Sequence, residues 1–533
     1  MGTLDFNALG LILPEERKLI PYDGPQLVAE VLDRAVERFP DKTALVSRFS
    51  RYTYAEIDAQ ANAAAEALRR LGIGKGDRVA ASMANHADIV LMFLGAMRLG
   101  AIWVGVNRQL AAPEKAYLLT DSQSAVFVSD QATVDAVRDR TDLRNLIVVD
   151  PADPASEWRA LVAAAAGAPR PEVEIDPFEP AAISYTSGTT GFPKGAVHSQ
   201  HNMLVVGAFT PNLFAAEDMT TASAMPLTIL NLMILGPVQA FRNAGKFVCM
   251  DRIDALGVAE WIRAEGINSM SFSPTMLHDL VTHPDISPDD LVSLTRPGVG
   301  GADCPPAWRD LFAAKGFAVS NGYGMTEAPT SITSQLPDDP RPPGSCGRAL
   351  PHLVITVVDE DDNLLGPNEI GEICVEGRKD GPTAGVYTPM LGYWNKPAET
   401  AKALRNGRYH TGDIGFIDND GIVTLKDRRN DMILRGGANV YPAEVERVLA
   451  QDRRLAAVAV MGVPDERLGE RVVAAVQPAD GEHVEPDELL ARCREELARY
   501  KVPDTLLIVD SMPRNAMNKI MKRDLKALFT DTQ

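Results

Sequence analysis

The feature that most constrains the fold is an alternation of short apolar runs with helical segments over the first 150 residues. Apolar runs stand at residues 43–47, 78–83, 101–106, 125–129 and 145–150, and segments with helical periodicity, such as 27–39, 59–72 and 87–100, precede them. Strands that alternate with helices indicate a parallel α/β sheet. The same helix–glycine–strand scheme recurs at residues 257–274 and 308–324.

The pattern changes twice further along the chain. Residues 354–376 are strand-rich, and residues 355–365 predict a hairpin with an acidic turn. After Asp427 a compact α+β unit follows, of a size that is normal for a separate domain. At 533 residues the chain exceeds the length at which one hydrophobic core stops growing. We therefore predict an α/β protein with a large N-terminal domain (1–426), which includes a β-rich subdomain, and a small C-terminal domain (427–533).

Composition narrows the functional classes. The net charge of −19 disfavours nucleic acid or an anionic membrane surface as the main partner. The five cysteines lie far apart without C-x-x-C spacing, which favours reduced thiols in a cytoplasmic protein. No run of about 18 apolar residues predicts a membrane span.

The stretch TSGTTGFPKG (residues 186–195) is a poor helix and a poor strand. Glycines allow backbone amides to approach phosphate oxygens, hydroxyls donate hydrogen bonds, and a lysine neutralises charge. The usual P-loop template fails, because Pro193 precedes Lys194 and Gly195 follows it. A flexible surface loop is the alternative for such a stretch, although the apolar run at 181–185 indicates a strand that leads into it.

This loop resembles the signature of the AMP-forming acyl-CoA synthetase family, also called the adenylate-forming superfamily. Five further stretches resemble motifs of that family and stand in the same order: NGYGMTE (321–327), GYWNKPAET (392–400), HTGDIG (410–415), the hinge segment KDRRNDMILRGGANVYPAEVE (426–446), and PRNAMNKIMKRDL (513–525). The resemblance covers most of the chain, from about Phe39 to Leu525.

The resemblance implies a role for each motif. The triphosphate would be bound by Thr186, Ser187, Gly188, Thr189, Thr190, Gly191 and Lys194, and Thr186 and Glu327 would coordinate Mg²⁺. The adenosine part would be bound by Gly301, Ala302, Asn321, Gly322, Tyr323, Gly324, Met325 and Thr326, with Asp413 and Arg428 at the ribose. Lys519 would bridge the substrate carboxylate and the α-phosphate and would be the main catalytic residue, beside Glu327 and Thr186.

The resemblance also implies a mobile C-terminal domain. Asp427 would be the hinge, and Gly436 and Gly437 would line a tunnel for coenzyme A. Two departures stand out. Asn518 replaces the glycine that usually precedes the catalytic lysine, and asparagine tolerates left-handed backbone angles. The segment at 225–230 lacks the usual aromatic–histidine pair. The acyl pocket would be apolar and lined by Thr228, Ile229, Leu232, Gly301 and Met325.

The function implied is an ATP-dependent acyl-CoA ligase that acts on a fatty, alicyclic or aryl carboxylic acid. Three alternatives stay open: an adenylating ligase that loads a separate carrier protein, a luciferase-like oxygenase, and an inactive nucleotide- or acyl-CoA-binding regulator. The presence of Lys519, Glu327 and Asp413 disfavours the regulator. Reversible acylation of Lys519 and a homodimeric assembly are further hypotheses.

Overall fold

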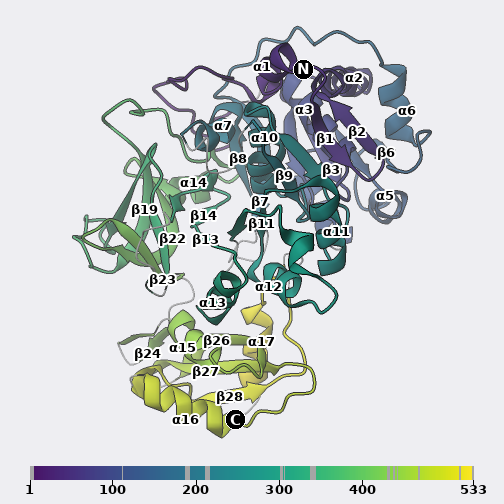
Figure 1. The fold of residues 1–533 in the computed structure, drawn as a ribbon. Helices are drawn as coiled ribbons and strands as arrows, with labels where there is room; N and C mark the ends of the chain where they lie inside the picture. Colours follow the sequence, from purple (N-terminus) through teal and green to yellow (C-terminus); the bar gives the residue numbers. More distant parts are fainter. Residues whose placement is uncertain are drawn as a thin grey trace.

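The computed structural model describes residues 5–110, 112–186, 193–209, 217–300, 304, 306–335, 342, 344–428, 433–435, 438–440, 442–465, 468–497, 499–514 and 518–530. Figure 1 shows helices packed around α/β sheets in the N-terminal part, a β-rich body beside them, and the C-terminal unit at the opposite end. The predicted fold class is therefore confirmed.

The first α/β sheet has the strand order β13–β12–β11–β9–β10–β1–β2. Its described pairs are parallel apart from β1 with β2, which is a hairpin. The bounds are β1 Thr43–Ser47, β2 Ser50–Thr53, β9 Thr220–Ser223, β10 Lys246–Cys249, β11 Ser269–Phe272, β12 Arg296–Val299 and β13 Ser320–Asn321.

The second α/β sheet has the order β20–β8–β7–β4–β3–β5–β6. The pairs from β7 to β6 are parallel, whereas β8 is antiparallel to both β7 and β20. The bounds are β3 Arg78–Ser82, β4 Ile102–Gly105, β5 Val126–Ser129, β6 Asn145–Val148, β7 Pro180–Thr186, β8 Lys194–Ser199 and β20 Gly392–Tyr393.

Helices cover these two sheets (Figure 1). They are α1 Asp33–Arg38, α2 Tyr54–Arg70, α3 Ala87–Arg98, α4 Ala112–Asp121, α5 Gln131–Arg138, α6 Glu157–Ala164, α7 Gln200–Phe209, α9 Leu230–Met233, α10 Gln239–Arg242, α11 Ala255–Glu265, α12 Pro274–Thr282 and α13 Pro306–Ala314, with a π-helical turn at Ile234–Val238.

An antiparallel sheet of order β16–β17–β23–β22–β19–β18 forms the β-rich body. The bounds are β16 Thr333–Ser334, β17 Ser345–Ala349, β18 Leu353–Val358, β19 Gly371–Gly377, β22 Arg408–Ile417 and β23 Ile422–Arg428, with β21 Leu404–Arg405 paired to β22, helix α14 Pro397–Ala403, and the small pair β14 Gly324–Met325 and β15 Thr330–Ser331. The hairpin with an acidic turn predicted at residues 355–365 is present: Val358 and Leu364 form an antiparallel bridge, and the amide of Asp359 donates to the carbonyl of Asn363 at 3.0 Å.

The C-terminal unit packs three helices on a sheet of order β25–β24–β27–β26, with β28 parallel to β27. The bounds are β24 Ile433–Arg435, β25 Ala438–Val440, α15 Pro442–Leu449, β26 Leu455–Asp465, β27 Gly469–Pro478, α16 Pro486–Glu496, β28 Thr505–Ile508 and α17 Lys522–Thr530. The helices and strands expected here at residues 440–451, 456–463, 486–500 and 504–512 are all present.

Local sequence explains several of these elements. Thr53 and Glu56 form a reciprocal capping box that starts α2, and Gly266 ends α11 with a left-handed φ of 61°. Every residue of α3 is buried, including the charged Asp88 and Arg98, so this mostly apolar helix lies inside the core. The predicted helix at 27–39 is instead divided into a 3₁₀ turn, Val28–Glu30, and the short α1. There the Glu30 carboxylate accepts the amides of Gln26 and Leu27.

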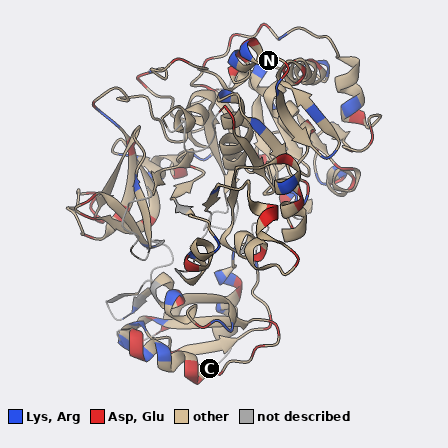
Figure 2. Ribbon diagram, viewed as in Figure 1, with Lys and Arg blue, Asp and Glu red and all other residues tan. Residues whose placement is uncertain are grey.

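Charged residues are distributed over the whole molecule. Figure 2 shows Lys and Arg interspersed with Asp and Glu in both the N-terminal part and the C-terminal unit. Among the described residues, no helix combines the length and the apolar character that a membrane crossing requires.

Buried neutral histidines predict a pH dependence of stability. Burial lowers the pKa of His198 to about 4 and that of His352 to about 3. The unfolded chain, in which a histidine has a pKa of about 6.5, therefore binds more protons below that pH than the folded chain does. We expect the free energy of unfolding to fall between pH 7 and pH 5 by about 2 kcal/mol per histidine. Urea unfolding followed by tryptophan fluorescence at the two pH values measures this loss.

The variant His352→Phe provides the control for that prediction. It keeps an aromatic ring stacked against Phe209, whose ring centroid lies 5.4 Å from that of His352, but removes the titrating group. The loss of stability between pH 7 and pH 5 should be smaller in this variant. An unchanged loss would show that other groups cause it.

Candidate active site

A hydroxyl, a carboxylate and a phenol meet where β7, β20 and the segment after β14 come together. The Thr186 hydroxyl donates to Glu327 Oε1 at 3.2 Å, and the Tyr393 hydroxyl donates to the same oxygen at 3.1 Å. The carbonyl of Glu327 accepts the Met390 amide at 2.8 Å, which fixes its backbone beside β20. Thr186 and Glu327, predicted as a pair, are thus adjacent despite a separation of 141 positions.

The predicted phosphate loop connects two paired strands. Thr186, the last residue of β7, lies opposite Lys194, the first residue of β8. The Lys194 ammonium lies 5.3 Å from the centroid of the Tyr393 ring, a cation–π distance. Lys194 and Thr186 therefore stand at the base of the loop, whereas Ser187, Gly188, Thr189, Thr190 and Gly191 lie outside the described residues.

A second carboxylate pairs with a second tyrosine. The Tyr323 hydroxyl donates to Asp413 Oδ2 at 2.6 Å, and both residues are buried. The Tyr323 amide donates to Thr333 Oγ1 at 2.9 Å, which holds the 321–327 segment against β16. Burial, and then the Asp413 carboxylate, raise the pKa of Tyr323 well above its ordinary value. Tyr323 therefore remains a hydrogen-bond donor to Asp413 at neutral pH.

A third tyrosine, Tyr409, lies close enough to both carboxylates to be affected by their charges. Burial raises the pKa of Tyr409 well above its ordinary value, and the nearby Glu327 and Asp413 carboxylates act in the same direction. Tyr393 and Tyr409 were not among the predicted site residues. Both lie in or next to recognised motifs, since Tyr393 is in GYWNKPAET and Tyr409 precedes HTGDIG.

Other predicted nucleotide-binding residues lie around these carboxylates. Gly322 and Gly324 are exposed, and Met325 and Thr326 are half-buried, in the segment that carries Tyr323 and Glu327. Arg428 pairs with Asp413 across β22 and β23, and Asn321 ends β13, but the side chains of both lie outside the described part of the chain. Gly301 and Ala302 also lie outside the described residues.

The predicted acyl-pocket segment packs against β4. Thr228 is 3% exposed, Ile229 and Leu232 are half-buried, and a Cβ on Gly105 would lie only 1.9 Å from the Thr228 carbonyl oxygen. Leu232 also lines a small cavity of about 40 Å³ between the π-helical turn and the strands β9 and β11. Thr221, Ser269 and Ser271 line the opposite wall. Among the described residues, Leu232 is the one predicted acyl-pocket residue in the lining of this cavity, and the apolar acyl pocket stays a prediction.

The close contact at Gly105 leads to a prediction. In Gly105→Ala the new methyl group meets backbone rather than a flexible side chain, so the Thr228 segment has to move. We expect a loss of about 1–3 kcal/mol in the free energy of unfolding, and, for the carboxylic acid and ATP that the sequence predicts as substrates, a higher KM for the acid with little change in KM for ATP. Thermal unfolding and steady-state kinetics measure both. Gly74→Ala, where the nearest atom would be 3.9 Å away, is the control, and equal KM values for the acid in both variants would contradict the placement.

The segment with Lys519 forms a turn in the C-terminal unit. Arg514 pairs with Ile520 as an isolated β-bridge, and the Met521 amide donates to the Pro513 carbonyl at 2.8 Å. Asn518 has a φ of 61°, so it adopts the left-handed conformation that was expected to preserve this turn. Lys519 is exposed. The side chain of Asp427 and both Gly436 and Gly437 lie outside the described residues.

Comparison with known proteins assigns the chain to a family. Residues 32–394 match the family model described as AMP-binding enzyme, and residues 444–519 match the model for the C-terminal domain of that enzyme. The chain belongs to the AMP-binding enzyme family. The predicted family is therefore confirmed.

Individual members of the AMP-binding enzyme family match over most of their length. The chain is 34% identical over 496 residues to a long-chain-fatty-acid–CoA ligase of Mycobacterium tuberculosis, covering 90% of this chain and 94% of that protein. It is 32% identical over 513 residues to an indoleacetate–CoA ligase of Aromatoleum aromaticum, covering 94% and 98%. The crystal structure of ATP-bound MatB from Rhodopseudomonas palustris superposes with a TM-score of 0.85 at 28% identity, covering 94% of this chain and 99% of that one.

Proposed function

We propose that this AMP-binding enzyme is an ATP-dependent acyl-CoA ligase. A carboxylate oxygen of the acid attacks the α-phosphorus of ATP, and the bond to the bridging oxygen breaks, releasing pyrophosphate. The thiol sulfur of coenzyme A then attacks the acyl carbon of the acyl-adenylate, and AMP leaves. Relatives named as CoA ligases for long-chain fatty acids and indoleacetate support this class of AMP-forming acid–thiol ligase.

One structural observation supports the adenylation step most directly. Thr186 is hydrogen-bonded to Glu327, and Tyr323 to Asp413, although the partners in each pair come from distant parts of the chain, and Tyr393 also donates to Glu327. Two anions, a carboxylate and a triphosphate, have to meet in this reaction, so the site must supply positive charge. Lys194 at the base of the phosphate loop, and Lys519 on the C-terminal unit, are the cations that we assign to this task.

The donor set at Glu327 fits a hard divalent cation. A carboxylate and a hydroxyl 3.2 Å apart are oxygen ligands of the kind that Mg²⁺ prefers. We propose that Thr186 and Glu327 hold Mg²⁺, which when bound neutralises charge on the phosphates. Tyr393 holds the Glu327 carboxylate in place through Oε1.

The remaining assignments follow the motifs. Asp413 accepts the ribose hydroxyls, with Arg428 beside it, and the 301–302 and 321–326 segments bind adenine. Lys519 contacts the acid and the α-phosphate when the C-terminal domain, residues 427–533, rotates at Asp427. Gly436 and Gly437 line the path of coenzyme A in the second arrangement of that domain.

The acid is proposed to lie against Thr228, Ile229, Leu232 and Met325. The cavity beside Leu232 combines an apolar wall with the hydroxyls of Ser269 and Ser271. A test of substrates should therefore include hydroxylated acids beside straight-chain, alicyclic and aryl acids.

The test of the proposed function is one incubation. Purified protein, ATP and Mg²⁺ are mixed with the pool of acids, with and without coenzyme A, and the products are measured by mass spectrometry. We expect CoA thioesters only when both ATP and coenzyme A are present. Acyl-adenylates that accumulate without any thioester would instead identify a carrier protein as the acceptor.

Two further proposals concern the cellular location and the oligomeric state of the enzyme. None of the five cysteines, all of them within the described residues, forms a disulfide, which agrees with a cytoplasmic location. We also propose a homodimer. Sedimentation velocity of the purified protein tests the second point, and a species with the mass of one chain would contradict it.

A further inference from the structure

The strand that carries Asp413 is distorted at that residue. Glu372 on β19 pairs with Ile414 on β22, but Cys374 pairs with His410, so two steps along β19 match four steps along β22. The extra residues form a bulge, Thr411–Gly412–Asp413, in which Gly412 has a left-handed φ of 73°. Bulges redirect side chains at functional sites. This bulge turns Asp413 toward Tyr323, whose hydroxyl it accepts at 2.6 Å.

A bulge removes amides from the strand ladder, and those amides need other partners. The Asp413 amide donates to Thr411 Oγ1 at 3.1 Å, and the Thr411 hydroxyl donates to the Ile373 carbonyl at 2.7 Å. The Gly412 amide donates to Glu372 Oε1 at 3.1 Å. Glu372 is 6% exposed, so the amide at the apex of the bulge is held by a buried carboxylate.

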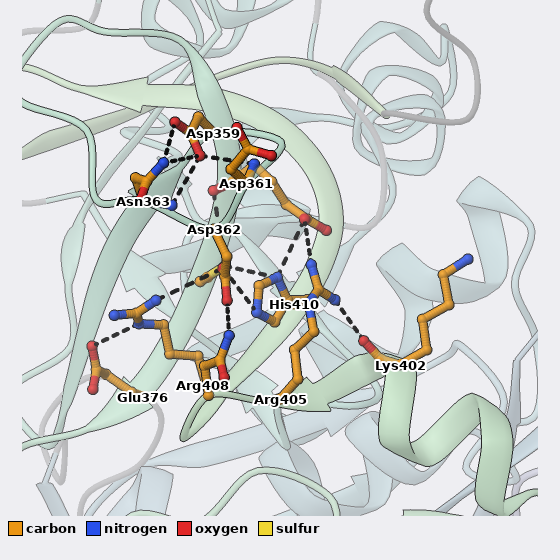
Figure 3. Close-up of polar contacts among 12 residues, drawn as sticks. Asp359, Asp361, Asp362, Asn363, Glu376, Lys402, Arg405, Arg408 and His410 are labelled. Carbon is orange, nitrogen blue, oxygen red and sulfur yellow. Dashed lines mark hydrogen bonds and ion pairs between the residues drawn. The ribbon is translucent and has the colours of Figure 1, made fainter.

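The second oxygen of Glu372 is held by cationic and imidazole groups. Oε2 lies 3.4 Å from Arg405 Nη2 and 3.2 Å from His410 Nδ1. Figure 3 shows His410 between Asp362 and Arg405, and His410 Nε2 lies 3.5 Å from Asp362 Oδ1. The carboxylate therefore cannot rotate away from Gly412 without losing these contacts.

We propose that Glu372 is a positioning residue that fixes the Gly412 bulge and thereby aims Asp413 at the ribose of ATP. The inference rests on the proposed ribose-binding role of Asp413. Glu372 touches no substrate in this scheme. Its effect on ATP passes through the Gly412 amide and the backbone of Asp413.

The chain provides a matched control on the same strand. Glu376 is 9% exposed, lies on the same face of β19 four residues further on, and pairs with Arg408 at 3.6 Å and Lys379 at 2.8 Å. Both of these ion pairs lie away from the bulge at Gly412. Glu376→Ala thus removes a similarly buried carboxylate and should lower stability to a similar degree without moving Asp413.

The experiment compares ATP with 2′,3′-dideoxy-ATP, which lacks the ribose hydroxyls that Asp413 would accept. The kcat/KM for each nucleotide is measured for the wild type, Asp413→Ala, Glu372→Ala and Glu376→Ala. We expect Glu372→Ala to lower kcat/KM for ATP about ten-fold, mainly through KM, and to have little effect with the dideoxy nucleotide. The preference for ATP should shrink in Glu372→Ala as in Asp413→Ala, and stay unchanged in Glu376→Ala.

Two further variants cover the case in which Glu372→Ala does not fold. Glu372→Gln keeps an oxygen that can accept the Gly412 amide and should keep the preference, whereas Glu372→Asp withdraws the oxygen and should lose it. The reverse order would overturn the inference. An equal loss with both nucleotides in Glu372→Ala would overturn it as well, since that is the result of general destabilisation.

The wild type and Asp413→Ala separate this inference from the proposed function. A preference that disappears in Asp413→Ala but persists in every Glu372 variant rejects the positioning role and leaves the ribose assignment intact. A wild type that uses both nucleotides equally well rejects the ribose assignment, and the positioning role with it.

Discussion

Replacing Lys519 with alanine is expected to lower the rate of acyl-adenylate formation about 100- to 1000-fold. The ammonium group is proposed to stabilise charge that develops between the carboxylate and the α-phosphate. No other residue of the turn at 513–521 is assigned that contact. ATP–pyrophosphate exchange in the presence of an accepted acid measures the step. The second step should survive, so Lys519→Ala given synthetic acyl-adenylate and coenzyme A should still form thioester at close to the normal rate.

The control for this variant is Lys526→Ala. Lys526 is exposed on α17, seven positions from Lys519, and is assigned no substrate contact. It should keep both half-reactions. If Lys519→Ala slows the two half-reactions equally, the lysine serves the fold or the movement of the C-terminal domain rather than adenylation.

The second large effect is expected at Glu327. In Glu327→Gln, kcat/KM should fall about 100-fold and the Mg²⁺ concentration for half-maximal rate should rise, because a neutral amide binds a hard cation more weakly than a carboxylate does. Initial rates over a Mg²⁺ titration at fixed ATP measure both quantities. Glu399→Gln is the control, since the Glu399 carboxylate also lies near Tyr393 but is not assigned to the metal site.

Combining Thr186→Val with Glu327→Gln tests whether the two residues bind the same Mg²⁺ ion. If Thr186 and Glu327 hold one cation, the double variant should be little worse than Glu327→Gln alone, because neighbouring residues that share a function are not additive. Multiplicative losses in the double variant, with an unchanged Mg²⁺ requirement in each single variant, would argue against a shared metal site.

Much of the fold could be predicted because the burial of strands and helices is reflected in the order of apolar and polar residues. Strands buried on both faces read as continuous apolar runs, so β3, β4 and β5 were recognisable from the letters alone. The sequence pattern does not predict that the 27–39 segment is divided into two short helical elements. The division depends on hydrogen bonds from the Gln26 and Leu27 amides to the Glu30 carboxylate, and hydrophobic periodicity carries no information about such bonds.

Some of the site residues could also be predicted from the sequence, whereas others could not. Motif resemblance indicated Thr186, Glu327, Tyr323 and Asp413, and the structure brings these residues together as pairs. The roles of Tyr393 and Tyr409 depend on how β20 and β22 approach Glu327 and Asp413, which no local pattern specifies. The bulge at Gly412 and the hydroxyl wall at Ser269 and Ser271 likewise depend on strand register.

The most direct test of the central claim follows an oxygen atom. An accepted acid labelled with ¹⁸O in both carboxylate oxygens is incubated with the enzyme, ATP, Mg²⁺ and coenzyme A, and the nucleotide and phosphate products are measured by mass spectrometry. Attack of the carboxylate on the α-phosphorus predicts one ¹⁸O in AMP and none in pyrophosphate. Unlabelled AMP, or ¹⁸O in inorganic phosphate with ADP as the nucleotide product, would contradict an acyl-adenylate intermediate and the account built on it.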